Sequence, residues 1–202
     1  MNEQQICAAD PRLERVLLTQ EEIRTRVSSL AREIAERHRQ APFYLIGVLK
    51  GACFFLTDLA RELCLAGCTE VRLDFIRTST YGNEVKKNGE AARSVRIEGP
   101  WTEMAGQRVI LVDDILDQGF TLAALRRHVL TTLGAEQVET CVFLEKDLRH
   151  PSPEVAAQRA SFKADYVGAR VPDRWVVGYG LDVAELYRSL PFVAIVKEEH
   201  FR

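Results

Sequence analysis

The segment from Arg108 to Thr121 constrains the fold more than any other part of this sequence. It reads RVILVDDILDQGFT, in which a branched apolar run is followed by two adjacent carboxylates, a third aspartate and a glycine. A continuous apolar run such as Val109–Val112 is typical of a strand buried on both faces of a parallel sheet. In such sheets, ligands bind outside the carboxyl ends of the strands. The segment therefore predicts an α/β fold with a ligand site at the end of this strand.

The loop after this strand has the features of an anion site. Asp113 and Asp114 are expected to point to opposite faces of the strand's end, and residues 117–121 form the loop that leads into the next helix. Backbone N–H groups and a helix N-terminus favour an anion. Thr121 adds a hydroxyl group, and Gly119 has no side chain to block a close approach. A phosphate monoester is the anion that fits this loop best.

Other interpretations of the acidic run are open. The letters DDILD match the DDxxD pattern of isoprenoid synthases, but that pattern lies on a helix, whereas here it follows a strand and occurs once. Receiver domains also carry an acidic pair after a strand, but their next strand ends in an aspartate, and here it ends at Glu145 and Lys146. A solvated acidic turn remains an alternative for Asp113 and Asp114 taken alone. The full pattern with a third acid, a glycine and a threonine argues against that alternative.

Strands and helices alternate along the rest of the chain. Thr19 and Glu22 form a capping box for a first helix, and residues 1–18 before it read as a loosely held arm. The alternation implies a parallel, doubly wound sheet. The expected strands are Phe43–Val48, Val71–Arg77 and Val138–Leu144, and the expected helices are about Ala52–Cys64 and Phe120–Thr132.

The C-terminal part is expected to return strands to the sheet edge and to build a small hood. The apolar segments that suggest this are Tyr166–Ala169, Trp175–Val177 and Phe192–Val196. No linker is long enough to separate two domains, so residues 1–202 are expected to form a single domain.

Three of the expected strands end in charged residues. One ends at Lys50, one at Asp113 with Asp114, and one at Lys146. The carboxyl ends of parallel strands meet at one edge, so these residues predict a pocket for a ligand that is both anionic and polar. The sequence contains neither a Walker pattern nor GxGxxG, which argues against a nucleoside triphosphate motor and a dinucleotide oxidoreductase.

Composition excludes several other classes of protein. The chain has 202 residues, of which 47% are hydrophobic and 28% charged, as in a soluble globular protein. A net charge of −2 offers no surface for nucleic acid, and no apolar run is long enough to cross a membrane. The start is too polar for a secretory signal, so a cytoplasmic location is expected.

The five cysteines are odd in number and lack the spacing of a zinc site. They are interpreted as reduced thiols, with Cys53 and Cys141 in the core. A metal site at Cys64 and Cys68 is the less favoured alternative.

Motifs along the chain resemble those of the hypoxanthine-guanine phosphoribosyltransferases, within the type I phosphoribosyltransferases. The segment 108–121 is similar to the family's phosphoribosyl-pyrophosphate signature. Four further motifs resemble, in order, its pyrophosphate loop, the start of its mobile lid, its purine-oxygen site, and its base-stacking and magnesium segment. They are GVLKGACFFLTDL at Gly47–Leu59, STYG at Ser79–Gly82, LEK at Leu144–Lys146 and PDRWVVGYGLD at Pro172–Asp182. The resemblance covers roughly Pro42 to Val196.

The resemblance implies that a purine ring nitrogen attacks the anomeric carbon of phosphoribosyl pyrophosphate, with magnesium-bound pyrophosphate as the leaving group. The purines would be hypoxanthine and guanine, and the products IMP and GMP. Asp117 would be the general base at purine nitrogen 7, with a helix cap as the alternative role. Asp113 and Asp114 would bind the ribose hydroxyls and magnesium (Mg2+). The family usually has Glu then Asp here, so Asp113 departs from its pattern.

The resemblance also assigns the two anion-binding ends of the substrate. Pyrophosphate would be bound by Lys50, Gly51 and Arg188, and the Leu49–Lys50 peptide can be cis in the family. Asp182 would bind magnesium. Surface salt bridges are the alternative for Arg188 and Asp182. Residues Gln118, Gly119, Phe120 and Thr121 would bind the phosphate, although the family commonly has Thr or Ser in place of Gln118.

The purine pocket would be formed by three residues. Lys146 would donate to the 6-oxygen, Trp175 would stack on the ring, and the backbone of Val176 would contact its edge; plain core packing is the alternative for Trp175. Residues 78–94, which include Thr80 and Tyr81, are interpreted as a lid or as a disordered loop.

Two other functions stay open. One is a preference for xanthine, and the other is a non-catalytic regulator of the same fold that binds nucleotides or RNA. Because family members form dimers or tetramers, a homodimer or homotetramer is expected, with small-molecule substrates as the other partners.

Overall fold

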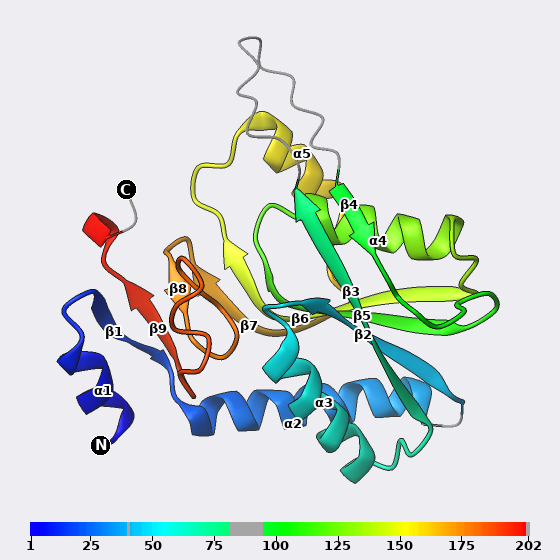
Figure 1. Cartoon of the computed structure of the whole chain (residues 1–202), viewed down its shortest axis with the longest axis horizontal. Helices are drawn as coiled ribbons and strands as arrows, with labels where there is room; N and C mark the ends of the chain where they lie inside the picture. Colours follow the sequence, from blue (N-terminus) through cyan, green and yellow to red (C-terminus); the bar gives the residue numbers. More distant parts are fainter. Residues whose placement is uncertain (40, 81–94, 201–202) are drawn as a thin grey trace.

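A six-stranded sheet lies at the centre of the larger part of the molecule (Figure 1). The structure is a computed structural model that describes residues 1–39, 41–80 and 95–200. The strand order is β4-β3-β2-β5-β6-β7, and neighbours run parallel except β4, which is antiparallel to β3. The strands are β2 (Phe43–Leu49), β3 (Val71–Thr80), β4 (Val95–Glu98), β5 (Arg108–Leu116), β6 (Gln137–Asp147) and β7 (Tyr166–Pro172).

Helices cover both faces of this sheet, so the predicted α/β fold with a mostly parallel, doubly wound sheet is confirmed. Leu45 and Ile110 pack with α2 and α3 in one apolar cluster. Their neighbours Ile46 and Leu111 pack with α4 in another, because successive strand residues point to opposite faces. The helices are α2 (Gln20–His38), α3 (Cys53–Leu65), α4 (Phe120–Thr131) and α5 (Pro153–Ser161).

Helix α2 begins at the predicted capping box. The N–H of Glu22 donates to Thr19 Oγ1 at 3.2 Å, and the N–H of Thr19 donates to Glu22 Oε2 at 2.8 Å. These bonds satisfy N–H groups that have no partner within the helix. The cap fixes where the helix starts, and its apolar side, which includes Val27 and Ile34, is then buried against the sheet.

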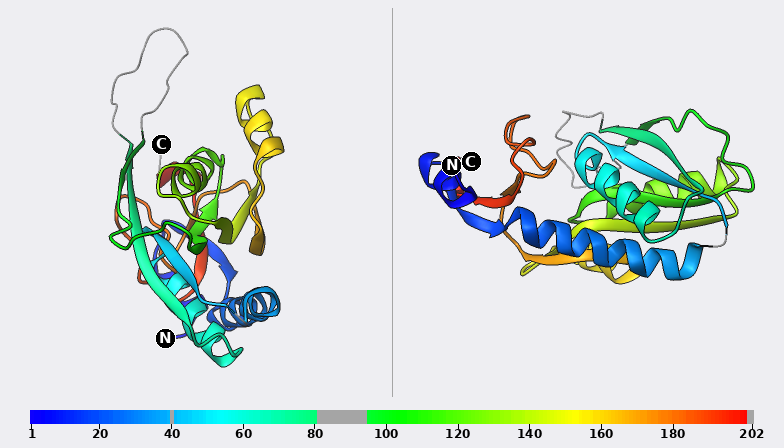
Figure 2. Two further views of the ribbon diagram at one scale, coloured as in Figure 1. Left: turned by 90° about the vertical axis from the view of Figure 1, so that its right-hand side faces the viewer. Right: turned by 90° about the horizontal axis from the view of Figure 1, so that it is seen from below.

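A second sheet of three antiparallel strands forms a hood, and the described residues at both ends of the chain, in the short helices α1 (Glu3–Ala9) and η1 (Glu198–His200), lie on the hood side of the molecule (Figure 2). Its strands, in the order β1-β9-β8, are β1 (Leu13–Leu18), β9 (Val193–Val196) and β8 (Val176–Val177). The expectation of a loosely held arm at residues 1–18 is therefore corrected. Helix α1 is capped by Asn2 and Gln5, and Cys7 is buried in an apolar cluster of the hood.

Three details differ from the expectation. Strand β3 extends beyond Arg77, so residues 78–80 belong to the strand and pair with β4 instead of starting a loop. Strand β5 continues through both aspartates to Leu116. Cys53 is exposed at the start of α3, whereas Cys141 is buried as expected.

The described residues contain neither a metal-binding cluster nor a membrane-spanning helix. Among the described residues, no three His, Cys, Asp or Glu side chains are grouped so that they could hold a metal ion, which disfavours the alternative of a metal at Cys64 and Cys68. The same residues contain no helix that is both long and apolar enough to cross a membrane.

Candidate active site

Three neighbouring strands bring the predicted charged residues to one edge of the sheet. Strand β5 pairs in parallel with β2 on one side and with β6 on the other. Lys50 follows β2, Asp113 and Asp114 lie near the end of β5, and Lys146 lies near the end of β6. The predicted convergence of these strand ends is confirmed.

Asp113 and Asp114 interact with each other at the end of β5, and the expectation that they point to opposite faces stays a prediction. The N–H of Asp114 donates to Asp113 Oδ1 at 3.0 Å. Burial, and then the charge of Asp114, raises the pKa of Asp113 well above its usual range. Burial also raises the pKa of Asp114, against the opposing effects of its hydrogen bond with Asp113 and the charge of Arg188. The pair therefore favours a shared proton or a bound cation.

The loop after β2 is packed directly against Asp114. A Cβ atom placed on Gly51 would lie 1.8 Å from Asp114 Oδ2, and one placed on Gly180 would lie 1.9 Å from the carbonyl oxygen of Gly51. Gly180 also has a φ of +103°, which other residues rarely adopt. The Leu49–Lys50 peptide is cis, in agreement with the resemblance. Both positions therefore require glycine so that β2, β5 and the C-terminal turn can meet.

Lys50 and Arg188, which come from distant parts of the chain, meet on one carboxylate. Lys50 Nζ lies 2.8 Å from Glu185 Oε2, and an Arg188 nitrogen lies 3.2 Å from Glu185 Oε1. Hydrogen bonds from Lys50 first, and then from Arg188, lower the pKa of Glu185. Arg188 also lies 2.9 Å from Asp182 Oδ1 and donates to the carbonyl oxygen of Gly180 at 2.7 Å. Two cations are thus held together around an exposed anion.

Asp117 and Lys146 face each other at the ends of β5 and β6. Lys146 Nζ lies 3.1 Å from Asp117 Oδ2 and 5.8 Å from the ring centre of Trp175. Trp175 is 45% exposed, so the alternative of plain core packing is wrong. Val176 is buried in β8, where it pairs with Ile195 of the hood. A carboxylate, an ammonium and a partly exposed aromatic ring therefore lie close to one another.

The loop between β5 and α4 has the predicted form of an anion site. Gly119 is the N-cap of α4 with a φ of +87°, and no side chain caps this helix end. The alternative role of Asp117 as a helix cap is therefore wrong. Phe120 and Thr121 begin the helix, and Gln118 is exposed. The first N–H groups of α4 remain available to an anion.

The predicted lid lies mostly outside the described residues. Thr80 is the last residue of β3 and pairs with Val95 at the start of β4, whereas Tyr81 and the rest of 81–94 are outside them. The strands on both sides of the segment are thus joined to each other.

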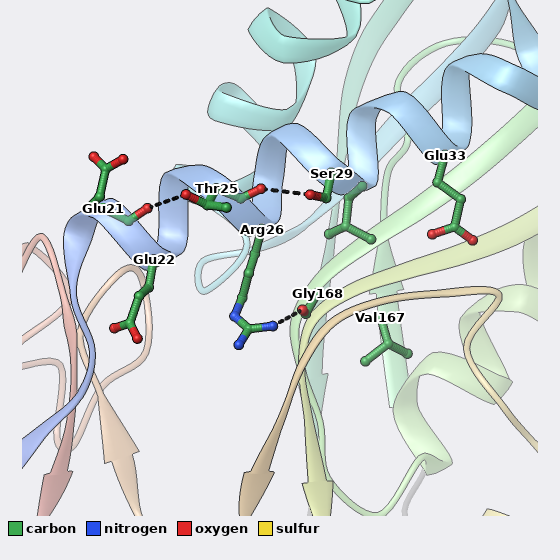
Figure 3. Close-up of a pocket in the computed structure, with 9 residues that line it drawn as sticks. Glu21, Glu22, Thr25, Arg26, Ser29, Glu33, Val167 and Gly168 are labelled. Carbon is green, nitrogen blue, oxygen red and sulfur yellow. Dashed lines mark hydrogen bonds between the residues drawn. The ribbon is translucent and has the colours of Figure 1, made fainter.

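A groove elsewhere on the surface lies between α2 and β7 (Figure 3). Arg26 crosses it and donates to the carbonyl oxygen of Gly168 at 3.2 Å. Its lining includes Glu21, Glu22 and Glu33, and none of the residues predicted for the site. Three carboxylates disfavour an anionic ligand there, so the sheet edge is the better candidate site.

Comparison with known proteins identifies the family. The family described as phosphoribosyl transferase domain matches residues 17–183. Hypoxanthine-guanine phosphoribosyltransferase from Bacillus subtilis (strain 168) is 35% identical over 92% of this chain and 94% of its own length. The enzyme of the same name from Aquifex aeolicus (strain VF5) is 37% identical over 91% and 95%. This chain belongs to the hypoxanthine-guanine phosphoribosyltransferase family.

A solved structure of the same family also matches this chain in fold. Hypoxanthine phosphoribosyltransferase from Trypanosoma cruzi, in complex with the product IMP, matches with a TM-score of 0.80 and 34% identity. The match covers 94% of this chain and 97% of the other. The predicted family and the predicted fold are both confirmed.

Two residues of this phosphoribosyltransferase site were not singled out in the sequence. Glu185 holds Lys50 and Arg188, and Arg159 of α5 contacts the loop that contains Asp117. Glu185 stands three positions before Arg188, a spacing that could have suggested an ion pair. Arg159 had no comparable local signal, because its partners lie on other strands.

Proposed function

We propose that the protein transfers the 5-phosphoribosyl group from phosphoribosyl pyrophosphate to hypoxanthine and guanine, which forms IMP or GMP and pyrophosphate in purine salvage. The single observation that carries the proposal is the 3.1 Å pair of Asp117 and Lys146 beside the exposed ring of Trp175. This group lies at the same sheet edge as an anion-binding loop, in a chain of this family. Such a site can bind a planar base next to a sugar phosphate.

At the purine, Asp117 is proposed to accept the ring proton as the glycosidic bond forms. A carboxylate within hydrogen-bond reach of the base is suited to this transfer. Lys146 can donate only, so it favours a 6-oxygen over the amino group of adenine. Trp175 is proposed to stack on the ring and the backbone of Val176 to contact its edge. These roles explain why Lys146 is mostly buried while Trp175 is exposed.

At the other end of the substrate, Lys50, Gly51 and Arg188 are proposed to bind pyrophosphate. The two cations already share the carboxylate of Glu185, which occupies them as an anion would. The loop from Gln118 to Thr121 is proposed to bind the 5-phosphate through its N–H groups. Thr80 and Tyr81 are proposed as part of a lid. Charge on both sides of the ribose would hold the reacting carbon in place.

Magnesium fits the paired carboxyl groups of Asp113 and Asp114. Two adjacent carboxyl groups whose pKa values are raised by burial offer hard oxygen donors, and Mg2+ is commonly bound by one or two carboxylates together with substrate phosphates. We therefore propose that Asp113 and Asp114 bind magnesium and the ribose hydroxyls. Asp182 is also proposed as a ligand, although it is paired with Arg188 and does not form a three-carboxylate cluster with Asp113 and Asp114. When bound, magnesium supplies positive charge to the leaving pyrophosphate.

An assay of four purines tests the proposal. Hypoxanthine, guanine, xanthine and adenine are each incubated with phosphoribosyl pyrophosphate and magnesium, and nucleotide formation is followed. We expect turnover with hypoxanthine and guanine and none with adenine. Higher turnover with xanthine would assign the alternative specificity, and nucleotide binding without turnover would assign a regulator.

The oligomeric state of the protein and its location in the cell are also proposals. A homodimer or homotetramer is proposed, and sedimentation of the purified protein at several concentrations tests it. The expected cytoplasmic location stays a prediction.

A further inference from the structure

Arg159 is a largely buried charged residue of helix α5, and its guanidinium contacts the carboxyl ends of β5 and β6. Helix α5 begins at Pro153 after the cap residue Ser152, whose side chain accepts from the N–H of Val155. No residue of this helix is fully buried, yet the Arg159 side chain is only 18% exposed (α5, Figure 1). A guanidinium that is withdrawn from solvent on a surface helix requires partners inside the molecule.

The partners of Arg159 belong to two different strands. One terminal nitrogen donates to the carbonyl oxygens of Leu116 at 3.3 Å and Asp117 at 3.2 Å. The other donates to Glu145 Oε1 at 2.6 Å and to the carbonyl oxygen of Lys146 at 3.4 Å. One planar group therefore bridges the end of β5 and the end of β6.

The two strand ends depend on this bridge to different degrees. The ladder between β5 and β6 ends at the pair Leu116 and Glu145, so Asp117 lies beyond it. Strand β6 continues along β7, where Lys146 pairs with Val171. The backbone of Lys146 thus has support without Arg159, whereas the loop after Leu116 takes its support from α5.

The bridge also orients the peptide groups of that loop. In a trans peptide the C=O and the following N–H point in opposite directions. Because Arg159 holds the carbonyl oxygens of Leu116 and Asp117, the N–H groups of Asp117 and Gln118 are turned away from α5. Gln158 adds to this arrangement, since its Nε2 donates to the carbonyl oxygen of Gly119 at 3.4 Å.

We propose that Arg159 is a positioning residue of the transferase site, which orients the N–H groups of the phosphate loop toward the 5-phosphate. This inference rests on the proposed function, because it takes the loop as the phosphate site. It requires that loss of Arg159 weaken phosphate binding more than base binding.

Binding of a nucleotide and its nucleoside separates these effects. We would measure the dissociation constants of IMP and inosine by calorimetry for the wild type and for Arg159→Met, well below the unfolding temperature. We expect IMP to bind about ten- to a hundredfold more weakly to the variant, as for lost charge-assisted hydrogen bonds, and inosine to change less than about twofold.

Arg170→Met is the matched control. Arg170 lies on β7, is 81% exposed and pairs with the other oxygen of Glu145 at 3.3 Å. Its loss removes a charge from the same carboxylate, and we expect unchanged binding of both ligands. If the two variants weakened IMP binding equally, Arg159 would be only an ion-pair partner of Glu145, and the proposal would be wrong.

A second variant covers the case in which Arg159→Met does not fold. Arg159→Lys keeps the charge beside Glu145 but cannot reach both strands, so we expect a smaller loss that is again confined to IMP. Equal loss of IMP and inosine in either folded variant would overturn the proposal. Failure of the wild type to bind IMP would instead count against the proposed function.

Discussion

The two ends of the central sheet differ in the partners of their acidic side chains. At the amino ends of β6 and β7, an acidic group has polar partners: His38 Nε2 lies 2.6 Å from Glu139 Oε2, and the hydroxyl of Tyr166 donates to Glu139 Oε1 at 3.4 Å. At the carboxyl end of β5, two like carboxyl groups, Asp113 and Asp114, are neighbours and are partly buried. The first arrangement stabilises the fold, whereas the second is suited to a ligand that brings positive charge.

Neighbouring acidic side chains differ in exposure, which is 26% for Asp165 and 46% for Asp117. At the amino end, Asp165 Oδ2 accepts from the N–H of Thr140 at 2.8 Å and from its hydroxyl at 2.9 Å. At the carboxyl end, Asp117 is 46% exposed although it pairs with Lys146. Substitutions at the amino end should therefore change stability, and those at the carboxyl end should change activity.

The largest expected effect is that of Asp117→Asn. We expect turnover to fall by about 10²–10⁴, the range for loss of a general acid or base, because an amide cannot accept the purine proton. Steady-state kinetics with hypoxanthine measure it, and thermal unfolding is the control, with a midpoint close to wild type. Near wild-type turnover would remove Asp117 from the mechanism.

Lys146→Met should have the next largest effect, and on selectivity in particular. The substitution keeps an unbranched side chain of similar size but removes its ammonium donor, so the preference for hypoxanthine over adenine should fall by about 10²-fold, as for a hydrogen bond to a charged group. The ratio of kcat/KM values for the two purines measures it. Equal losses in purine and phosphoribosyl pyrophosphate binding would place Lys146 outside the base pocket.

Glu139→Gln tests the amino end of the sheet. Loss of the buried charge beside His38 should lower the free energy of unfolding by about 1–3 kcal/mol, because polar partners are left poorly paired. Denaturant unfolding measures the change, and kcat should remain as in the wild type. A large fall in kcat without a stability change would contradict the division between the two ends.

Asp113→Asn should have the smallest effect, with the opposite sign. Its pKa is raised in the folded state, so the folded protein binds more protons than the unfolded chain, and stability is lost as pH rises above the ordinary Asp range. Without magnesium at neutral pH, the amide should raise the unfolding midpoint by about a few degrees. It still accepts from the N–H of Asp114. A lower midpoint would mean that the carboxylate pair is not destabilising.

Local sequence patterns predicted most of the fold and the place of the site. Continuous apolar runs marked the buried strands, and the charged residues after them identified the edge where ligands bind. The position of Cys53 could not be read from hydrophobicity, because it depends on which side of α3 faces the sheet. The buried side is set by Phe55, Leu56, Leu59 and Leu63, and Cys53 falls outside it.

Contacts between distant segments were the part that local patterns could not predict. The arm at residues 1–18 is ordered because β1 pairs with β9 at the other end of the chain. The contact of Glu185 with Lys50 spans 135 positions. Arg159 likewise acts on strands that only the folded chain brings to α5. Such pairs leave no periodic signal in the sequence.

The pairing of β1 with β9 also bears on how the protein folds. Contacts between distant segments close a long loop and tend to form late in folding. Strand β1 is far from β9 in the sequence, whereas neighbouring strands of the central sheet are closer together, so the central sheet can form before the hood closes. Trp175 and Val176 lie at the hood, and we therefore expect them to reach their final positions late in folding. The proposed purine pocket would then be completed by the slowest part of the fold.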